Sequence, residues 1–158
     1  MKVLVGFYSR SGNTEKMAQA IAEGVKKAGL AVDVKNVNDI KTKDLLDYQA
    51  IIFGSPTYYG QMAAEMKTLL DESVKYHGKL TGKIGGAFTS CGNIAGGAET
   101  TILGILQAFL IHGMVIVGES GAYHYGPVSI ESPDADVAKS CIKYGQKIAT
   151  LAKKVFRE

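Results

Sequence analysis

The chain has 158 residues, a formal net charge of +3 and only three prolines. This length, with 46% hydrophobic and 21% charged residues, predicts a single globular domain over residues 1–158. The mild charge, with lysines near the ends of predicted helices, argues against nucleic-acid binding. The apolar start is too short for a membrane span and is not followed by the small-residue cleavage site of a signal peptide, and the two cysteines have no metal-ligand spacing. We therefore expect a cytoplasmic protein without membrane insertion or a structural metal.

The first half of the chain alternates apolar runs with helical patterns. Lys2–Tyr8 is typical of a buried strand, and Asn13–Ala28 has apolar residues at helical spacing before a glycine stop. Ala31–Val37 is rich in β-branched residues and predicts a second strand, followed by a short helix over Lys43–Tyr48. Ala50–Gly54 is a compact apolar run, which is typical of a central parallel strand buried on both faces.

The second half repeats this alternation. A helix is predicted over Met62–Ser73 and a fourth strand over Ile84–Ser90, followed by an apolar helix over Glu99–His112. Met114–Val117 predicts the fifth strand. Apolar residues then step by four and three over residues 137–155, which predicts a closing amphipathic helix.

Five strands that alternate with helices predict right-handed crossovers and a parallel sheet. For five such units we expect an α/β, flavodoxin-like three-layer sandwich, with a five-stranded parallel sheet of order 2-1-3-4-5 and helices on both faces. In that topology a ligand crevice lies at the carboxyl ends of strands 1 and 3. The loops after strands 1, 3 and 4 are therefore the places to look for chemistry.

The loop after the first strand concentrates polar groups where a helix begins. A helix start offers unpaired N–H groups and a partial positive charge, so these residues predict a phosphate site, although Ser11 or Asn13 alone could simply cap the helix. The loop has neither a Walker A sequence nor a G-x-G-x-x-G fingerprint, which disfavours an ATPase or a Rossmann dehydrogenase. The predicted site residues here are Ser9, Arg10, Ser11, Gly12, Asn13 and Thr14.

The loops after strands 3 and 4 have the composition expected around a planar ring. Two adjacent tyrosines can flank such a ring, because stacking and area burial hold it. The second loop is rich in glycine and small polar groups, whose amides could donate to the polar edge of an isoalloxazine. The predicted residues are Pro56, Thr57, Tyr58, Tyr59 and Gly60 in the first loop and Ser90, Cys91, Gly92, Asn93 and Gly96 in the second.

These motifs recur in order in one known family. The segments are Ser9–Thr14, Gly54–Met62, Phe88–Ser90 with Gly96–Thr101, and His112–Val117. With them, the chain resembles the tryptophan-repressor-binding-protein-type NAD(P)H:quinone oxidoreductases of the flavodoxin superfamily over nearly its whole length.

The resemblance implies FMN as cofactor, NAD(P)H as co-substrate, a quinone or other small electron acceptor, and a homo-oligomer, either dimer or tetramer. It implies that Ser9–Thr14 bind the FMN phosphate and that Thr57, Tyr58 and Tyr59 contact the flavin ring. The loop Ser90–Gly96 would hold the pyrimidine edge of the flavin, and Ser11 would also touch the nicotinamide nucleotide.

Three features depart from the family pattern. Only Asn38–Gln49 joins strands 2 and 3, where longer members carry an insertion that supports tetramer packing. The chain has Ile111 and His112 in place of two consecutive histidines, and it has no tryptophan before strand 4, where Tyr76 and His77 are nearest.

Two functions remain open on these residues. An enzyme would pass two electrons from NAD(P)H through the flavin to a quinone, and it would need no side-chain acid, so we assign no catalytic residue. A flavodoxin would instead carry electrons between protein partners. Such carriers usually have an acidic surface that steers their partners, and the net charge of +3 favours the enzyme.

Overall fold

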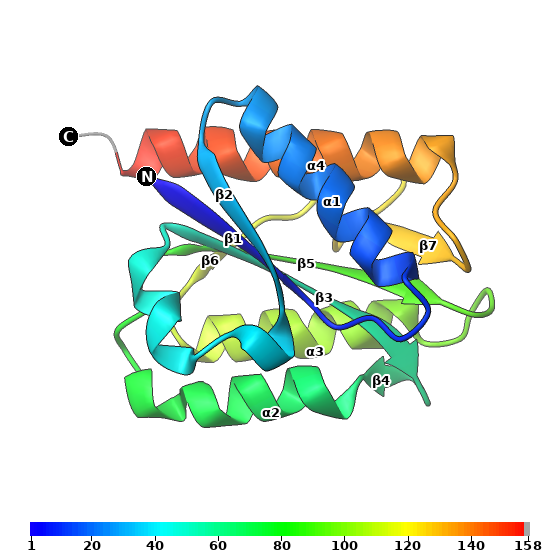
Figure 1. Ribbon diagram of the computed structural model, residues 1–158, viewed down its shortest axis with the longest axis horizontal. Helices are drawn as coiled ribbons and strands as arrows, with labels where there is room; N and C mark the ends of the chain where they lie inside the picture. The colour runs from blue at the N-terminus through cyan, green and yellow to red at the C-terminus, as the bar shows by residue number, and fades with distance from the viewer. Residues whose placement is uncertain (157–158) are drawn as a thin grey trace.

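The computed structural model describes residues 1–156 as a largely parallel sheet between two helical layers (Figure 1). Its strands are β1 (Lys2–Phe7), β2 (Ala31–Asn36), β3 (Ala50–Tyr58), β4 (Gln61–Met62), β5 (Ile84–Cys91), β6 (Val115–Ile116) and β7 (Val128–Ile130). Its α-helices are α1 (Asn13–Lys27), α2 (Ala64–Glu72), α3 (Ala98–Ile111) and α4 (Ala135–Val155). Three short 3-10 helices are η1 (Val37–Asp39), η2 (Thr42–Asp47) and η3 (Ser73–Tyr76).

The sheet has the order β2-β1-β3-β5-β6, with β1 parallel to both of its neighbours. This confirms the predicted order 2-1-3-4-5, since β5 and β6 are the fourth and fifth strands of the prediction. β5 is buried along its whole length, as expected for a strand covered on both faces.

The two helical layers cover opposite faces of the sheet: α1 and α4 lie on one face, and α2 and α3 on the other (Figure 1). Each helix buries the apolar stripe that its spacing predicts. Met17, Ile21 and Val25 of α1 are fully buried, as are Cys141 and Ile148 of α4. None of the helices within residues 1–156 is long and apolar enough to cross a membrane.

β3 is longer than predicted and runs through Pro56 to Tyr58. The predicted end of this strand at Gly54 was wrong. β1 ends beside Gly54, whose carbonyl accepts the Tyr8 N–H, whereas β5 continues to pair as far as Pro56. Backbone groups two residues apart point to the same side of a strand, so the missing N–H of Pro56 faces the side that β1 has already left.

The fifth strand also differs from its prediction. Only Val115 and Ile116 of the predicted Met114–Val117 pair with β5, and the chain then leaves the sheet. It returns as β7, which pairs with the carboxyl end of β5 from Val128 to Ile130. A strand of three residues has too short a pattern to be recognised by its periodicity.

A hairpin follows β3 where the sequence predicted the start of a helix. Met62 lies in β4, antiparallel to β3, and α2 begins two residues later at Ala64. Tyr59 and Gly60 form the turn, both with positive φ (49° and 77°). Positive φ at both central residues is the pattern of a type I′ turn, which suits the twist of paired strands.

Candidate functional site

A cavity of about 160 Å³ lies at the carboxyl ends of β1, β3 and β5. It is where the fold predicts a ligand crevice, and it joins the three loops that the sequence singled out. Its lining residues are Ser11, Asn13, Pro56, Thr57, Tyr58, Ser90, Cys91, Gly92 and Glu131.

The first wall of the cavity is the loop before α1. Gly12 caps this helix with a left-handed backbone (φ 88°), and no side chain caps the helix start. The Gly12 N–H donates instead to Ser9 Oγ at 3.0 Å, which closes the loop upon itself. The first N–H groups of α1 therefore remain available to an anion, with the favourable end of the helix dipole behind them.

Thr14 does not line the cavity. It is buried, and its Oγ1 lies 2.8 Å from Ser90 Oγ at the end of β5. This hydroxyl pair ties the first loop to the third. Thr14 thus supports the position of Ser90, which does line the cavity.

An aromatic residue with a cation over its ring forms the second wall. Tyr58 is half-buried and lines the cavity, and the Arg10 guanidinium lies over its ring at 5.4 Å from the centroid. Cation–π contacts of this kind fix the orientation of the ring. The hydroxyls of Tyr8 and Tyr58 raise the pKa of Arg10 further, so the cation is retained at any ordinary pH. Tyr59 is fully exposed at the tip of the hairpin.

A chain of hydroxyls holds β3, β5 and α3 together beneath the cavity. Thr89 donates to the Ser55 carbonyl at 2.6 Å, so in the 3.0 Å contact between Thr57 and Thr89 the donor is Thr57. Thr101 Oγ1 donates to the Gly97 carbonyl at 2.9 Å and also lies 3.0 Å from Thr57 Oγ1, so either threonine neighbour can accept the Thr57 proton. The Thr57 proton is therefore committed inside the protein, and this side chain positions the strand end.

The third wall is the segment after β5. Cys91 belongs to that strand, and its buried thiol donates to the Asn93 carbonyl at 3.2 Å. The Gly96 N–H donates to the same carbonyl, which folds the segment into a tight turn. A side chain at Gly96 would meet Cys91 Sγ, which accounts for glycine here. Cys91 is thus a packing residue of the turn.

The hairpin turn is fixed from the side of α3. Thr100 Oγ1 donates to the Gly60 carbonyl at 2.6 Å, and the backbone of Gly97 packs directly on Gly60. A Cβ atom at Gly97 would collide with this turn. The position of Gly60 is therefore set by the start of α3.

Glu131 is a lining residue that sequence reasoning missed. It follows β7, has a positive φ of 58°, and donates its N–H to the Cys91 carbonyl at 2.8 Å. One sequence feature could have pointed to Glu131. Like the end of β3, a run with apolar residues, Val128–Ile130, lies shortly before a Ser-Pro pair, Ser132 and Pro133.

The other predicted site residues lie around the cavity and not in its lining. They belong to the same three loops, and the structure separates them from the predicted residues that line the cavity. These residues are Ser9, Arg10, Gly12, Thr14, Tyr59, Gly60, Asn93 and Gly96.

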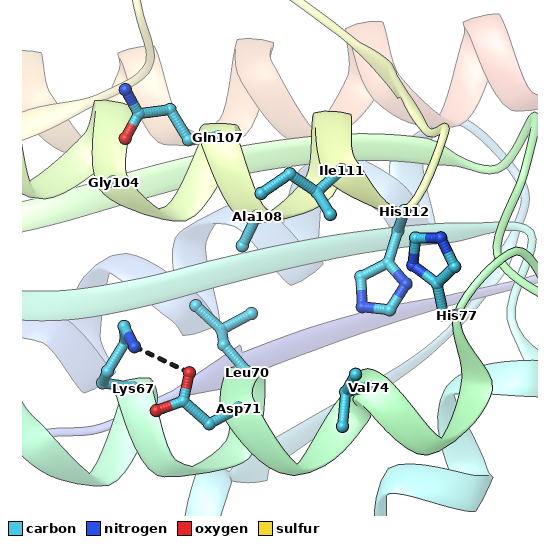
Figure 2. A pocket seen from close by; sticks show the side chains of 10 residues that line it. All are labelled: Lys67, Leu70, Asp71, Val74, His77, Gly104, Gln107, Ala108, Ile111 and His112. Atoms are coloured by element: carbon cyan, nitrogen blue, oxygen red, sulfur yellow. Dashed lines mark hydrogen bonds and ion pairs between the residues drawn. The ribbon is translucent and has the colours of Figure 1, made fainter.

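A larger cavity than the one beside Tyr58, of about 500 Å³, lies elsewhere, between α2 and α3 (Figure 2). His112 lines it at the amino-terminal side of the sheet, so this histidine does not reach the cavity beside Tyr58 within one chain. Burial, and secondarily His77, lower the pKa of His112.

Comparisons with known proteins agree with this architecture. The family model described as flavodoxin matches residues 5–97. A flavodoxin of Clostridium saccharobutylicum is 35% identical over 99% of this chain and 100% of its own length. An NAD(P)H dehydrogenase (quinone) of Sinorhizobium fredii is 42% identical over 74% of this chain and 70% of its own.

A solved structure has the same fold. The flavodoxin, WrbA-like protein from Agrobacterium tumefaciens superposes with a TM-score of 0.85 at 25% identity, over 97% of this chain and 98% of that one. With the strand order and the three polar loops at the carboxyl edge of the sheet, these matches establish that the chain is a flavodoxin-like flavoprotein and belongs to the flavodoxin family.

Proposed function

We propose that the chain binds FMN in the cavity between the loops after β1, β3 and β5 and transfers two electrons from NAD(P)H to a quinone. The observation that carries this proposal is the uncapped start of α1, which lies beside an aromatic wall in one cavity. The first feature suits a phosphate and the second a planar ring. A relative named as a quinone dehydrogenase at 42% identity supports the reaction.

The phosphate would be held by the loop before α1. Its backbone N–H groups supply the donors, and Ser11 and Asn13 add side-chain donors at the cavity surface. Ser9 Oγ already accepts the Gly12 N–H, which leaves its own proton free for an anion. Gly12 allows this curvature because a left-handed backbone is easily adopted only by glycine.

The ring would lie against Tyr58, with Arg10 behind it, and meet the backbone of the turn after β5 at its polar edge. When bound, FMN supplies the hydride and electron chemistry. The chain positions the ring, offers amide donors and excludes water on the sides it covers. Glu131 is the only carboxylate among the described lining residues, and the reaction does not need it as an acid.

A riboflavin comparison tests the phosphate site. Ser11→Ala should weaken FMN binding by the cofactor-free protein at least tenfold, or about 1.4 kcal/mol, and leave riboflavin binding unchanged because riboflavin has no phosphate. Thr68→Ala, an exposed hydroxyl loss on α2, is the matched control. If the variant bound both ligands equally more weakly, or bound FMN as tightly as wild type, this loop would not be the phosphate site.

The second candidate is an electron carrier, which the full-length match to a flavodoxin favours. Anaerobic mixing of the FMN-loaded protein with NADH or NADPH, followed by a benzoquinone, separates the two. Rapid loss of flavin absorbance and its return with quinone are expected for the reductase. If neither nucleotide reduces the flavin while chemical reductants do, the chain is a carrier and the quinone proposal is wrong.

A further inference from the structure

Glu131 is the one charged residue among those of residues 1–156 that line the cavity beside Tyr58. It follows β7 directly and has a left-handed backbone, with a φ of 58°. Two hydrogen bonds hold it there: its N–H donates to the Cys91 carbonyl at 2.8 Å, and its carbonyl accepts the Ser129 hydroxyl at 3.0 Å. Glycine adopts this conformation without strain, whereas glutamate does not. A strained backbone that places a charged residue at a cavity points to a use for its side chain.

The Glu131 carboxylate makes no ion pair within residues 1–156, and the residue is exposed. Lys16 of α1 donates instead to the hydroxyl of the next residue, Ser132, at 3.1 Å. This contact places the turn after β7 beside the start of α1. Glu131 also shares its cavity of about 160 Å³ with Ser11, so it lies close to the proposed phosphate site.

The groups near this end of the cavity are mostly hydrogen-bond donors. Ser11, Asn13 and the uncapped N–H groups of α1 can all donate to a phosphate. An ionised carboxylate only accepts hydrogen bonds, and it repels a phosphate because both are negative. Glu131 therefore needs a ligand group that donates and that lies next to the phosphate.

We propose that the Glu131 carboxylate accepts hydrogen bonds from the hydroxyls of the ribityl chain of FMN. The inference rests on the proposed function and adds a specificity determinant to that site. The ribityl chain joins the phosphate to the ring, so its hydroxyls are the donors nearest to the phosphate. Hydrogen bonds to a charged acceptor are stronger than those between neutral groups. Glu131 thus selects flavins that carry a hydroxylated side chain.

Three flavins with the same ring separate the contributions. Lumiflavin has neither the ribityl chain nor the phosphate, riboflavin has the chain alone, and FMN has both. Binding to the full-length, cofactor-free protein is measured by quenching of flavin fluorescence. Glu131→Ala should weaken riboflavin binding at least tenfold, or about 1.4 kcal/mol, and leave lumiflavin binding unchanged. FMN binding should weaken less than riboflavin binding, since the variant also loses the repulsion between carboxylate and phosphate.

Two further variants exclude indirect effects. Glu131→Gly relieves the backbone strain and should bind riboflavin as weakly as Glu131→Ala, which separates loss of the carboxylate from distortion of the turn. Glu72→Ala removes an exposed glutamate of α2 outside the cavity and should bind all three flavins as wild type does.

Other outcomes separate this inference from the proposed function. Unchanged riboflavin affinity, or equal weakening of lumiflavin and riboflavin, would overturn the role of Glu131 and leave the FMN site intact. Tighter FMN binding with unchanged riboflavin binding would also overturn it, because the carboxylate would then only repel the phosphate. A wild-type protein that binds none of the three flavins would refute the proposed function and this inference together. The expected binding pattern without flavin reduction by NADH or NADPH would support the role of Glu131 and refute only the reductase.

Discussion

The two helical layers of this protein are built differently, although both cover the same sheet. α1 and α4 pack so closely that each contributes a glycine where the other's backbone passes: Gly24 lies against the Ile142 carbonyl, and Gly145 against the Ile21 carbonyl. In the opposite layer, Gly104 of α3 faces the cavity between α2 and α3 and the flexible end of Met62. The same residue type permits close helix packing in one layer and leaves open space in the other.

The buried polar groups of the two layers show the same difference. Tyr144 of α4 accepts the Ala87 N–H at 3.2 Å and donates to the Val117 carbonyl, so its hydroxyl is satisfied. His112, at the end of α3, has a buried Nδ1 without a hydrogen-bond partner among the described residues. Unsatisfied buried groups and open grooves lower stability. We therefore expect the α1/α4 layer to contribute more to stability than the α2/α3 layer.

Alanine at Gly24 should cause the largest loss of stability. The added Cβ collides with the backbone of α4, which cannot move aside as a side chain could. Overpacking of this kind costs about 1–3 kcal/mol and outweighs the gain of up to about 1 kcal/mol from better helix propensity. Urea unfolding should therefore show a clear fall in midpoint. A Gly24→Ala protein as stable as wild type would contradict the close packing of α1 on α4.

Acid should destabilise the α2/α3 layer through His112. Its folded pKa is lowered by burial and by His77, so the folded state binds fewer protons than the unfolded state, whose pKa is about 6.5. This contribution to stability is therefore complete at neutral pH and falls as the pH drops below about 6.5, by at most about 1.4 kcal/mol per pH unit.

The His112→Gln variant checks this assignment, because its amide can still donate to Ser73 Oγ, as Nε2 of His112 does, but does not titrate. Between about pH 7.5 and about pH 5.5, the free energy of unfolding measured with urea should fall less in this variant than in wild type. His124→Gln, at an exposed histidine, is the control and should retain the wild-type loss. Equal losses in all three proteins would assign the acid sensitivity to other groups.

Gly104→Ala should have the smallest effect and gives the direct contrast to Gly24→Ala. Its Cβ comes close to Met62 Cε, the end of a flexible side chain, at 2.9 Å, and makes an ordinary contact with Gln61 Oε1 at 3.6 Å. Helix propensity then dominates, so stability should stay the same or rise by up to about 1 kcal/mol. A loss comparable to that of Gly24→Ala, measured by the same urea unfolding, would mean that the two layers are equally tight.

Much of the site was predictable because its signals are local. A polar, glycine-containing segment between a strand and a helix predicts an anion site from six consecutive residues, and the apolar spacing of α1 and α4 predicts their buried faces. Glu131 was missed because β7 is too short to have a period. The contact of Thr14 with Ser90 was missed because the two residues lie in distant segments.

The sequence by itself determined the four α-helices, the order of the five main parallel strands and the three loops at one edge of the sheet, because periodicity, glycine stops and helix-start chemistry act over a few residues. Only the tertiary structure decided where β3 ends. The strand can continue through Pro56 because β1 stops beside Gly54 and needs no N–H from Pro56. The tertiary structure alone distinguished Gly24, packed on a backbone, from Gly104, open to a cavity. These outcomes depend on which distant segment lies opposite each residue, and that is a property of the folded chain.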